Sequence, residues 1–132
     1  PNLGLCLDSF HILATKTSLN QIDNIDLEKI FFVQLADYMW SEIHSVEERI
    51  ATARTFRVFP GEGVHTKELA NMVRMLDQMG YRGDYSFEVF NDDYQTMPLD
   101  FVARRAYQAA QWLSEDILQR ALPLAGQLKL RH

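Results

Sequence analysis

The sequence has one cysteine, few basic residues and no long apolar run. Cys6 stands alone among 132 residues, which excludes an internal disulfide and favours a reducing, cytoplasmic compartment. Lys and Arg number 13 against 18 Asp and Glu, and the formal net charge of −5 argues against a nucleic-acid or anionic-membrane surface. No apolar stretch approaches the length that spans a bilayer. We therefore expect no nucleic acid and no membrane as partners.

The glycine motifs of nucleotide-binding proteins are also missing. There is no Walker loop, and Gly61-Glu62-Gly63 lacks the third glycine of a dinucleotide fingerprint and does not directly follow a strand. What is present is the composition of a folded domain, with 47% hydrophobic and 23% charged residues. The length allows one domain with one sizeable core.

Three short apolar runs predict buried strands over Leu3 to Leu7, Ile30 to Leu35 and Tyr85 to Phe90. Cys6, inside the first run, is expected to be a small core residue. Helices are predicted over residues 18–25, 47–55 (with Ile50 and Ala53 turned inward), 66–79 and from Pro98 to the Leu122-Pro123-Leu124 segment that ends the last one. This order predicts an α/β fold of three consecutive parallel βα units.

A side chain that can bind a metal follows or ends each predicted strand, namely Asp8, Gln34 and Glu88. Neighbouring parallel strands bring such groups to one rim of the sheet, where oxygen donors suit Mn²⁺ or Mg²⁺; Zn²⁺ is a further choice if imidazole joins. Each residue could instead serve the fold alone, Asp8 by capping a loop and Gln34 as a satisfied polar side chain. His11, one turn beyond Asp8, could bind substrate or carry a proton.

Four further residues have weaker signals. Arg57 precedes the Gly-rich turn, where a cation would neutralise a carboxylate, phosphate or enolate oxygen; the alternative is a surface arginine. Asp37 could hold a metal ligand in place. Glu62 and His65 are expected to be exposed.

Four segments resemble a known family. Leu-Cys-Leu-Asp-Ser-Phe-His (5–11), Val-Gln-Leu-Ala-Asp (33–37), Arg-Val-Phe-Pro-Gly-Glu-Gly (57–63) and Ser-Phe-Glu-Val-Phe-Asn-Asp (86–92) look like the last three strands of xylose-isomerase-like TIM barrels. This is the sugar phosphate isomerase/epimerase superfamily, which includes 3-dehydroshikimate dehydratases. The resemblance covers about residues 3–113.

The resemblance implies roles for individual residues. Asp8, Gln34 and Glu88 match the metal ligands of strands six, seven and eight, where the metal is Mn²⁺ or Mg²⁺, or else Co²⁺ or Zn²⁺. His11 matches a substrate-contacting histidine and Arg57 an arginine that binds substrate oxygens. Glu88 and His11 would be the catalytic residues. Gln34, where many sugar epimerases carry His, points toward the dehydratases.

The resemblance also implies that residues 1–132 form one partial domain, the carboxyl-terminal part of a (β/α)8 barrel without strands one to five. Three βα units cannot close such a barrel, so we expect either self-association or pairing with the missing amino-terminal part, and an inactive isolated chain.

The expected activity of the intact protein is metal-dependent proton abstraction α to a carbonyl of a sugar, sugar phosphate or dehydroshikimate-like substrate. Reprotonation would give isomerisation or epimerisation, which is the expected function, and loss of hydroxide would give dehydration, which is the alternative. Two other classes stay open, a non-catalytic domain and a phosphodiester-cleaving metalloenzyme. The acidic charge and the lack of a His-rich zinc set oppose the second.

Overall fold

The computed structural model describes residues 2–122. The elements follow in this order: β1 (Leu5–Asp8), α1 (Ser9–Ala14), the 3-10 helices η1 (Leu19–Asn24) and η2 (Leu27–Lys29), β2 (Ile30–Leu35), α2 (Val46–Thr55), α3 (Thr66–Met79), β3 (Tyr85–Phe87), α4 (Asp92–Thr96), α5 (Leu99–Gln111) and the π-helical turn η3 (Trp112–Ile117). The expectation of an α/β fold is confirmed.

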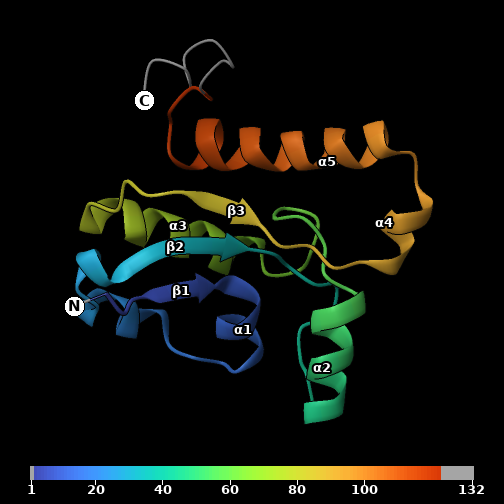
Figure 1. Cartoon of the computed structure of the whole chain (residues 1–132), viewed down its shortest axis with the longest axis horizontal. Coiled ribbons are helices and arrows are strands. Elements are labelled where there is room, and N and C mark those ends of the chain that lie inside the picture. The colour runs from blue at the N-terminus through green and yellow to red at the C-terminus, as the bar shows by residue number, and fades with distance from the viewer. Residues whose placement is uncertain (1, 123–132) are drawn as a thin grey trace.

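The three strands form one parallel sheet in the order β1-β2-β3. All three arrows point the same way, and α1, α2 and α4 lie toward the end at which they point (Figure 1). Asp8 pairs with Gln34, and Gln34 pairs with Ser86. Because paired residues of parallel strands lie at the same height, this register places the predicted site residues at the carboxyl rim.

The core lies on one face of the sheet. Val33 and Leu35 of β2 pack there against the apolar face of α3. That face has the predicted helical spacing and consists of Leu69, Met72, Val73 and Leu76. The helix stops at Gly80, whose φ of 100° lies in the left-handed region that favours glycine.

The other face of the sheet carries Cys6, Gln34 and Ser86, none of which is buried. The expectation that Cys6 is a core residue is therefore wrong: the thiol is exposed. Leu5, on the same edge strand, is 47% exposed. A strand is buried on both sides only where both faces are covered, and the exposure of Cys6 shows that residues 2–122 leave this face of β1 open.

Several element boundaries differ from the sequence prediction. Strand β3 ends at Phe87 instead of Phe90, and the Phe90 carbonyl accepts a hydrogen bond from Arg57 N at 3.0 Å. In α2, Ile50 is 46% exposed, and Thr52 is the buried residue of that helix. The helix expected over residues 18–25 is a 3-10 helix. The segment predicted to end the last helix runs past residue 122 and so lies partly outside the described residues.

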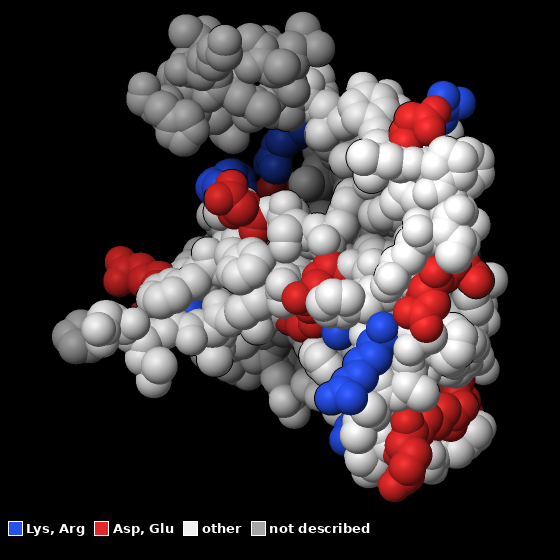
Figure 2. Space-filling model, turned by 45° about the vertical axis from the view of Figure 1, so that its right-hand side comes forward, with Lys and Arg blue, Asp and Glu red and all other residues white. Residues whose placement is uncertain are grey.

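Acidic and basic side chains are interspersed over the face seen in Figure 2. Within residues 2–122 no helix combines the length and the apolar character that crossing a lipid bilayer requires.

Candidate metal and substrate site

Asp8 ends β1 and begins α1. Its Oδ1 atom accepts hydrogen bonds from Phe10 N at 2.8 Å and His11 N at 3.4 Å, which makes Asp8 the N-cap of a short helix. Its Oδ2 atom accepts a hydrogen bond from Arg57 Nη1 at 3.0 Å. Asp8 therefore caps a helix with Oδ1, as the structural alternative expected. Its Oδ2 atom faces the candidate site.

Glu88 lies one residue beyond β3 and extends its pairing, since Glu88 N donates to Leu35 O at 3.3 Å. Its Oε2 atom accepts a hydrogen bond from the same Arg57 Nη1 atom at 3.4 Å. Asp8 and Glu88 come from the two outer strands, yet one guanidinium nitrogen bridges them. The two carboxylates thus converge on one cationic group at the rim.

Gln34 lies between them on the central strand. It is half-buried, and its Oε1 atom accepts a hydrogen bond from the Cys6 thiol at 3.3 Å. Loss of hydration around the sulfur raises the pKa of the Cys6 thiol, and the negative charges of Asp8 and Glu88 raise it further. A neutral thiol therefore borders the candidate site.

Arg57 is the most enclosed residue of the group, with 3% of its surface exposed, so the surface-arginine alternative is wrong. Its Nε atom donates to Ala53 O at 2.8 Å, and Nη1 also donates to Glu88 O at 3.3 Å. The guanidinium lies over the rings of Phe10 and Phe90, 4.7 and 5.6 Å from their centroids. These contacts hold a permanent positive charge beside both carboxylates.

His11 projects from α1 into solvent. Its side chain is 56% exposed, and Nε2 lies 3.8 Å from Asp8 Oδ2. The Phe10 ring meets its imidazole edge-on at 5.2 Å. An exposed imidazole beside an acid at the rim can exchange protons with solvent, as a proton carrier must.

Asp37 does not reach the metal candidates, and the idea that it holds one of them is wrong. It is fully buried, and it accepts hydrogen bonds from Tyr38 N at 2.7 Å and from His65 N at 3.2 Å, with His65 Nδ1 2.8 Å away. Burial raises the pKa of the Asp37 carboxyl, although its hydrogen bonds and His65 act in the opposite direction. His65, expected to be exposed, is buried by this contact.

The Asp37–His65 pair fixes the segment that carries Arg57. Asp37 and Val58 exchange two backbone hydrogen bonds of 2.9 Å, and Val58 directly follows Arg57. Gly63 lies so close that an added Cβ would stand 2.3 Å from Asp37 Cγ. The glycine therefore lies directly against a buried carboxylate of the chain itself.

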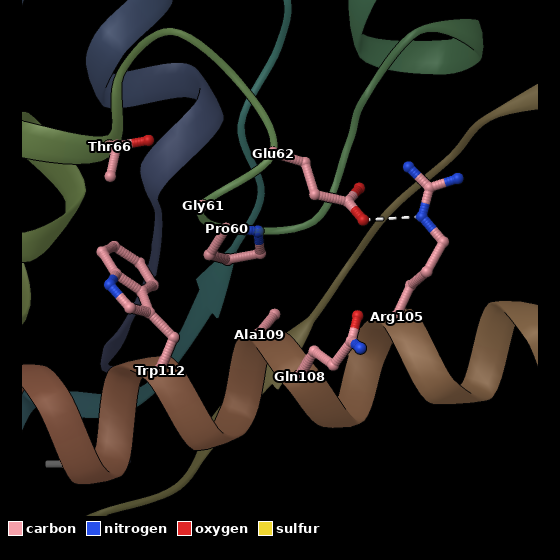
Figure 3. A pocket seen from close by; sticks show the side chains of 8 residues that line it. All are labelled: Pro60, Gly61, Glu62, Thr66, Arg105, Gln108, Ala109 and Trp112. Atoms are coloured by element: carbon pink, nitrogen blue, oxygen red, sulfur yellow. Dashed lines mark hydrogen bonds and ion pairs between the residues drawn. The ribbon is translucent and has the colours of Figure 1, made fainter.

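Glu62 belongs to a separate cluster on the outer side of the same loop. Figure 3 shows it pointing toward Arg105 of α5, across a cavity of about 250 Å³ lined also by Trp112. Glu62 Oε1 lies 2.6 Å from Arg105 Nε, and the Tyr94 hydroxyl donates to Glu62 Oε2 at 2.8 Å. The sequence prediction of an exposed Glu62 missed this ion pair, because its partner lies 43 residues away.

The candidate donor set fits a divalent cation in its chemistry. Asp8, Gln34 and Glu88 offer oxygen atoms only, and the two carboxylates already attract one cationic side chain. Within residues 2–122 no three His, Cys, Asp or Glu side chains are placed to hold one ion. The set is accordingly two carboxylates and an amide.

Comparison with known proteins gives a consistent match. Residues 1–116 match the model of the xylose isomerase-like TIM barrel family. A 3-dehydroshikimate dehydratase of Pseudomonas aeruginosa is 38% identical over 125 residues, which cover 92% of this chain and 19% of that protein. An inosose isomerase of Halalkalibacterium halodurans is 28% identical over 105 residues, covering 80% of this chain and 34% of that protein. The chain thus spans about a fifth and about a third of these relatives.

Two solved structures share the fold. One is a fusion of a xylose isomerase-like TIM barrel with a 4-hydroxyphenylpyruvate dioxygenase; it is 34% identical, with a TM-score of 0.74 over 92% of this chain and 20% of that one. The other is the IolI protein with a bound zinc atom, at 24% identity and a TM-score of 0.71 over 88% of this chain and 39% of that one. At that identity the second structure bears on the fold alone.

Proposed function

This chain belongs to the xylose isomerase-like TIM barrel family, and from that premise we propose that the intact protein abstracts a proton α to the carbonyl of a small, sugar-like substrate. The observation that carries the proposal is the convergence of Asp8 and Glu88, from the two outer strands, on one nitrogen of Arg57. Acidic groups beside a fixed cation are what enolate formation requires, because negative charge moves from the base to the substrate oxygen.

We assign the roles as follows. Asp8, Gln34 and Glu88 would hold a divalent metal, which supplies a positive charge that polarises the substrate carbonyl. Glu88 removes the α-proton. Arg57, held over Phe10 and beside Glu88, faces the substrate oxygen that gains charge. His11, exposed at the rim, exchanges protons between substrate and solvent.

Between the two outcomes of such an intermediate, dehydration of a 3-dehydroshikimate-like substrate is favoured over isomerisation of an inosose-like one. The dehydratase relatives are 38% and 36% identical to this chain, whereas the inosose isomerases are 28% and 27% identical. Gln34 at the seventh-strand position is consistent with the same choice. Isomerisation remains the second candidate because both reactions begin with the same proton removal.

The test is solvent exchange. The complete protein is incubated in deuterium oxide with 3-dehydroshikimate and with inosose, and α-proton loss is followed by nuclear magnetic resonance. Glu88→Gln should slow the exchange by at least about 100-fold, the usual contribution of a positioned acid or base. Formation of protocatechuate, seen by its ultraviolet absorbance, identifies the dehydratase. Unchanged exchange in Glu88→Gln overturns the role of Glu88.

Metal binding is tested separately by calorimetry with Mn²⁺. Asp8→Asn and Glu88→Gln should each weaken binding, while Asp100→Asn, an exposed change of the same kind on α5, should not. Equal affinities in all three variants would remove the ligand assignment. Metal binding without exchange in the complete protein would favour the non-catalytic alternative.

A further inference from the structure

A cavity of about 300 Å³ lies next to the candidate site, on the side of α2. Its wall includes three arginines and a histidine, namely Arg49, Arg54, Arg57 and His11, together with the ring of Phe90. We call it the basic cavity. His11 and Arg57 also belong to the candidate site, where both approach Asp8 Oδ2. The basic cavity is therefore continuous with the place where the substrate is expected.

The arginines of the basic cavity differ in their partners. Arg57 is neutralised by Asp8 and Glu88. In the described part of the chain, neither Arg49 nor Arg54 has a carboxylate within ion-pair distance. Glu48, the acid next to Arg49, is instead directed to His44 N at 2.7 Å. Two uncompensated guanidinium groups thus face one cavity.

This concentration of positive charge is unusual for the molecule. The chain as a whole carries a formal charge of −5, yet three of its arginines line this one cavity. Like charges that share a cavity repel each other, and a bound anion would relieve that repulsion. Guanidinium groups suit carboxylate and phosphate because their N–H donors match two oxygens at once.

We propose that the basic cavity binds the carboxylate or phosphate group of the substrate, with Arg49 and Arg54 as the binding residues. The inference rests on the proposed function, since it places the substrate's reacting part beside Asp8 and Glu88 and its anionic group beside α2. A neutral cyclitol would gain nothing from these two arginines. The basic cavity therefore selects an acidic substrate.

The test measures anion binding by the chain itself, without metal and at low ionic strength. Calorimetric titrations use inorganic phosphate, benzoate and, as a neutral probe, myo-inositol. Both anions, or one of them, should bind saturably and myo-inositol should not. The arm that binds more tightly identifies phosphate or carboxylate as the group recognised.

The variant is Arg49→Gln combined with Arg54→Gln, and its matched control is Arg104→Gln combined with Arg74→Gln. The control removes the same charge from exposed positions on α5 and α3. Anion affinity should fall by about tenfold or more in the first pair, as expected for lost charge-assisted hydrogen bonds, and by less than about twofold in the control. Arg54→Gln alone changes an exposed position, so we expect it to fold normally, and it should show a partial loss of anion affinity.

Three results would overturn the inference: no saturable anion binding, unchanged binding in the double variant, or an equal loss in the control pair. Failure here is distinguishable from failure of the proposed function. If Mn²⁺ binding and α-proton exchange persist while anion binding is absent, only the basic cavity is refuted. If anions bind but Glu88→Gln leaves exchange unchanged, only the catalytic assignment is refuted.

Discussion

Arg57 donates hydrogen bonds to both candidate carboxylates and to two backbone carbonyls. Its Nη1 atom donates to the Asp8 and Glu88 carboxylates and to the Glu88 backbone carbonyl, and its Nε atom donates to the Ala53 carbonyl. Sequence analysis identified the residue from its place before a Gly-rich turn but left open whether it was exposed. The partners could not be predicted, since Asp8 and Glu88 lie 49 and 31 residues away.

Replacing Arg57 by methionine should lower the free energy of unfolding by about 3 kcal/mol, because two carboxylates would remain without their counter-charge. We take the lower end of the range for a broken buried pair, since the Glu88 side chain is 32% exposed and can recover hydration. Urea unfolding at neutral pH measures the change. Arg104→Met, exposed on α5, is the control and should stay near the parent. Equal stability of the two variants would contradict this account.

Tyr85 gives a prediction about pH. Its hydroxyl is buried and has no hydrogen-bond partner among the described residues. Burial, followed by the nearby Tyr81 and Asp77, raises the pKa of Tyr85 from 10.0 to about 12. The folded form therefore holds its proton more tightly than the unfolded form, so the stability tied to the neutral phenol is present below pH 10 and is lost as the pH rises toward 12.

Tyr85→Phe should remove this dependence on pH. At neutral pH the variant should equal or exceed the parent by up to about 1 kcal/mol, because an unpaired buried hydroxyl is lost. Between about pH 9 and about pH 11 it should lose less stability than the parent. Urea unfolding at both pH values tests this, and Tyr107→Phe at an exposed position is the control. Parallel losses in parent and variant would exclude Tyr85 as the source.

At the scale of the elements, the loop between α2 and α3 is held in place by the residues that follow β2. Asp37 binds the backbone of His65 and pairs with Val58, and Tyr38 O accepts a hydrogen bond from Val64 N at 3.1 Å. The Tyr38 and His65 rings lie 4.1 Å apart. These contacts position the segment on which Arg57 depends, so the loop is part of the rigid frame of the site.

Gly63→Ala should destabilise the chain by about 1–3 kcal/mol, the range for inserting a methyl group into a packed region. The added Cβ would lie 2.5 Å from the Tyr38 carbonyl oxygen as well as against Asp37, and backbone cannot rotate away. Gly4→Ala is the control: its Cβ would meet only the exposed Phe31 ring, which can move. Thermal unfolding compares the two, and a loss no larger in Gly63→Ala than in Gly4→Ala would refute the close-packing argument.

The sequence predicted long elements well and short ones poorly. Strand β2 and helix α3 have the predicted bounds, because an apolar run and a regular apolar face are strong local signals. Helices α1 and α4 were missed. Each has only five or six residues and depends on a capping side chain, Asp8 or Asn91, whose hydrogen bonds to the backbone cannot be told from those of a loop.

The position of the candidate ligands at one rim of the sheet could be predicted from the sequence, whereas their roles stay a prediction. The candidate ligands each follow or end an apolar run, and parallel topology alone brings such positions to one rim. The enclosure of His65 and Arg57 was beyond prediction, because it depends on contacts between distant segments. The basic cavity was not predicted either, because in the sequence Arg49 and Arg54 look like the polar face of an ordinary surface helix.

At the scale of the whole molecule, we expect the two outer strands to be where chains associate. Strands β1 and β3 each have one neighbour in the described sheet. Apolar side chains lie exposed near β1, among them Leu3 at 82%, Leu5 at 47% and Phe31 at 55%. Exposed strand edges with apolar side chains are sites at which chains associate. This chain covers only about a fifth to a third of the length of its relatives. An exposed apolar edge is what we expect if further βα units pack against it in the intact protein.

The chain alone should therefore self-associate as its concentration rises. Leu5→Lys with Phe31→Lys should reduce the association, because charges on the exposed apolar surface oppose its burial against another chain. Sedimentation velocity over a dilution series measures it. Leu99→Lys, on α5 and 83% exposed, is the control and should associate like the parent. A parent that sediments as a monomer throughout would show that this surface does not drive assembly.

The thiol on the open face has a practical consequence. Because Cys6 is the only cysteine of the chain and its sulfur lies 3.3 Å from the Gln34 amide oxygen, a maleimide dye would attach at one known point beside the proposed ligands. A paramagnetic ion such as Mn²⁺ arriving there would quench the dye's emission, while the carboxylates remained chemically intact. Occupancy could then be followed optically in real time.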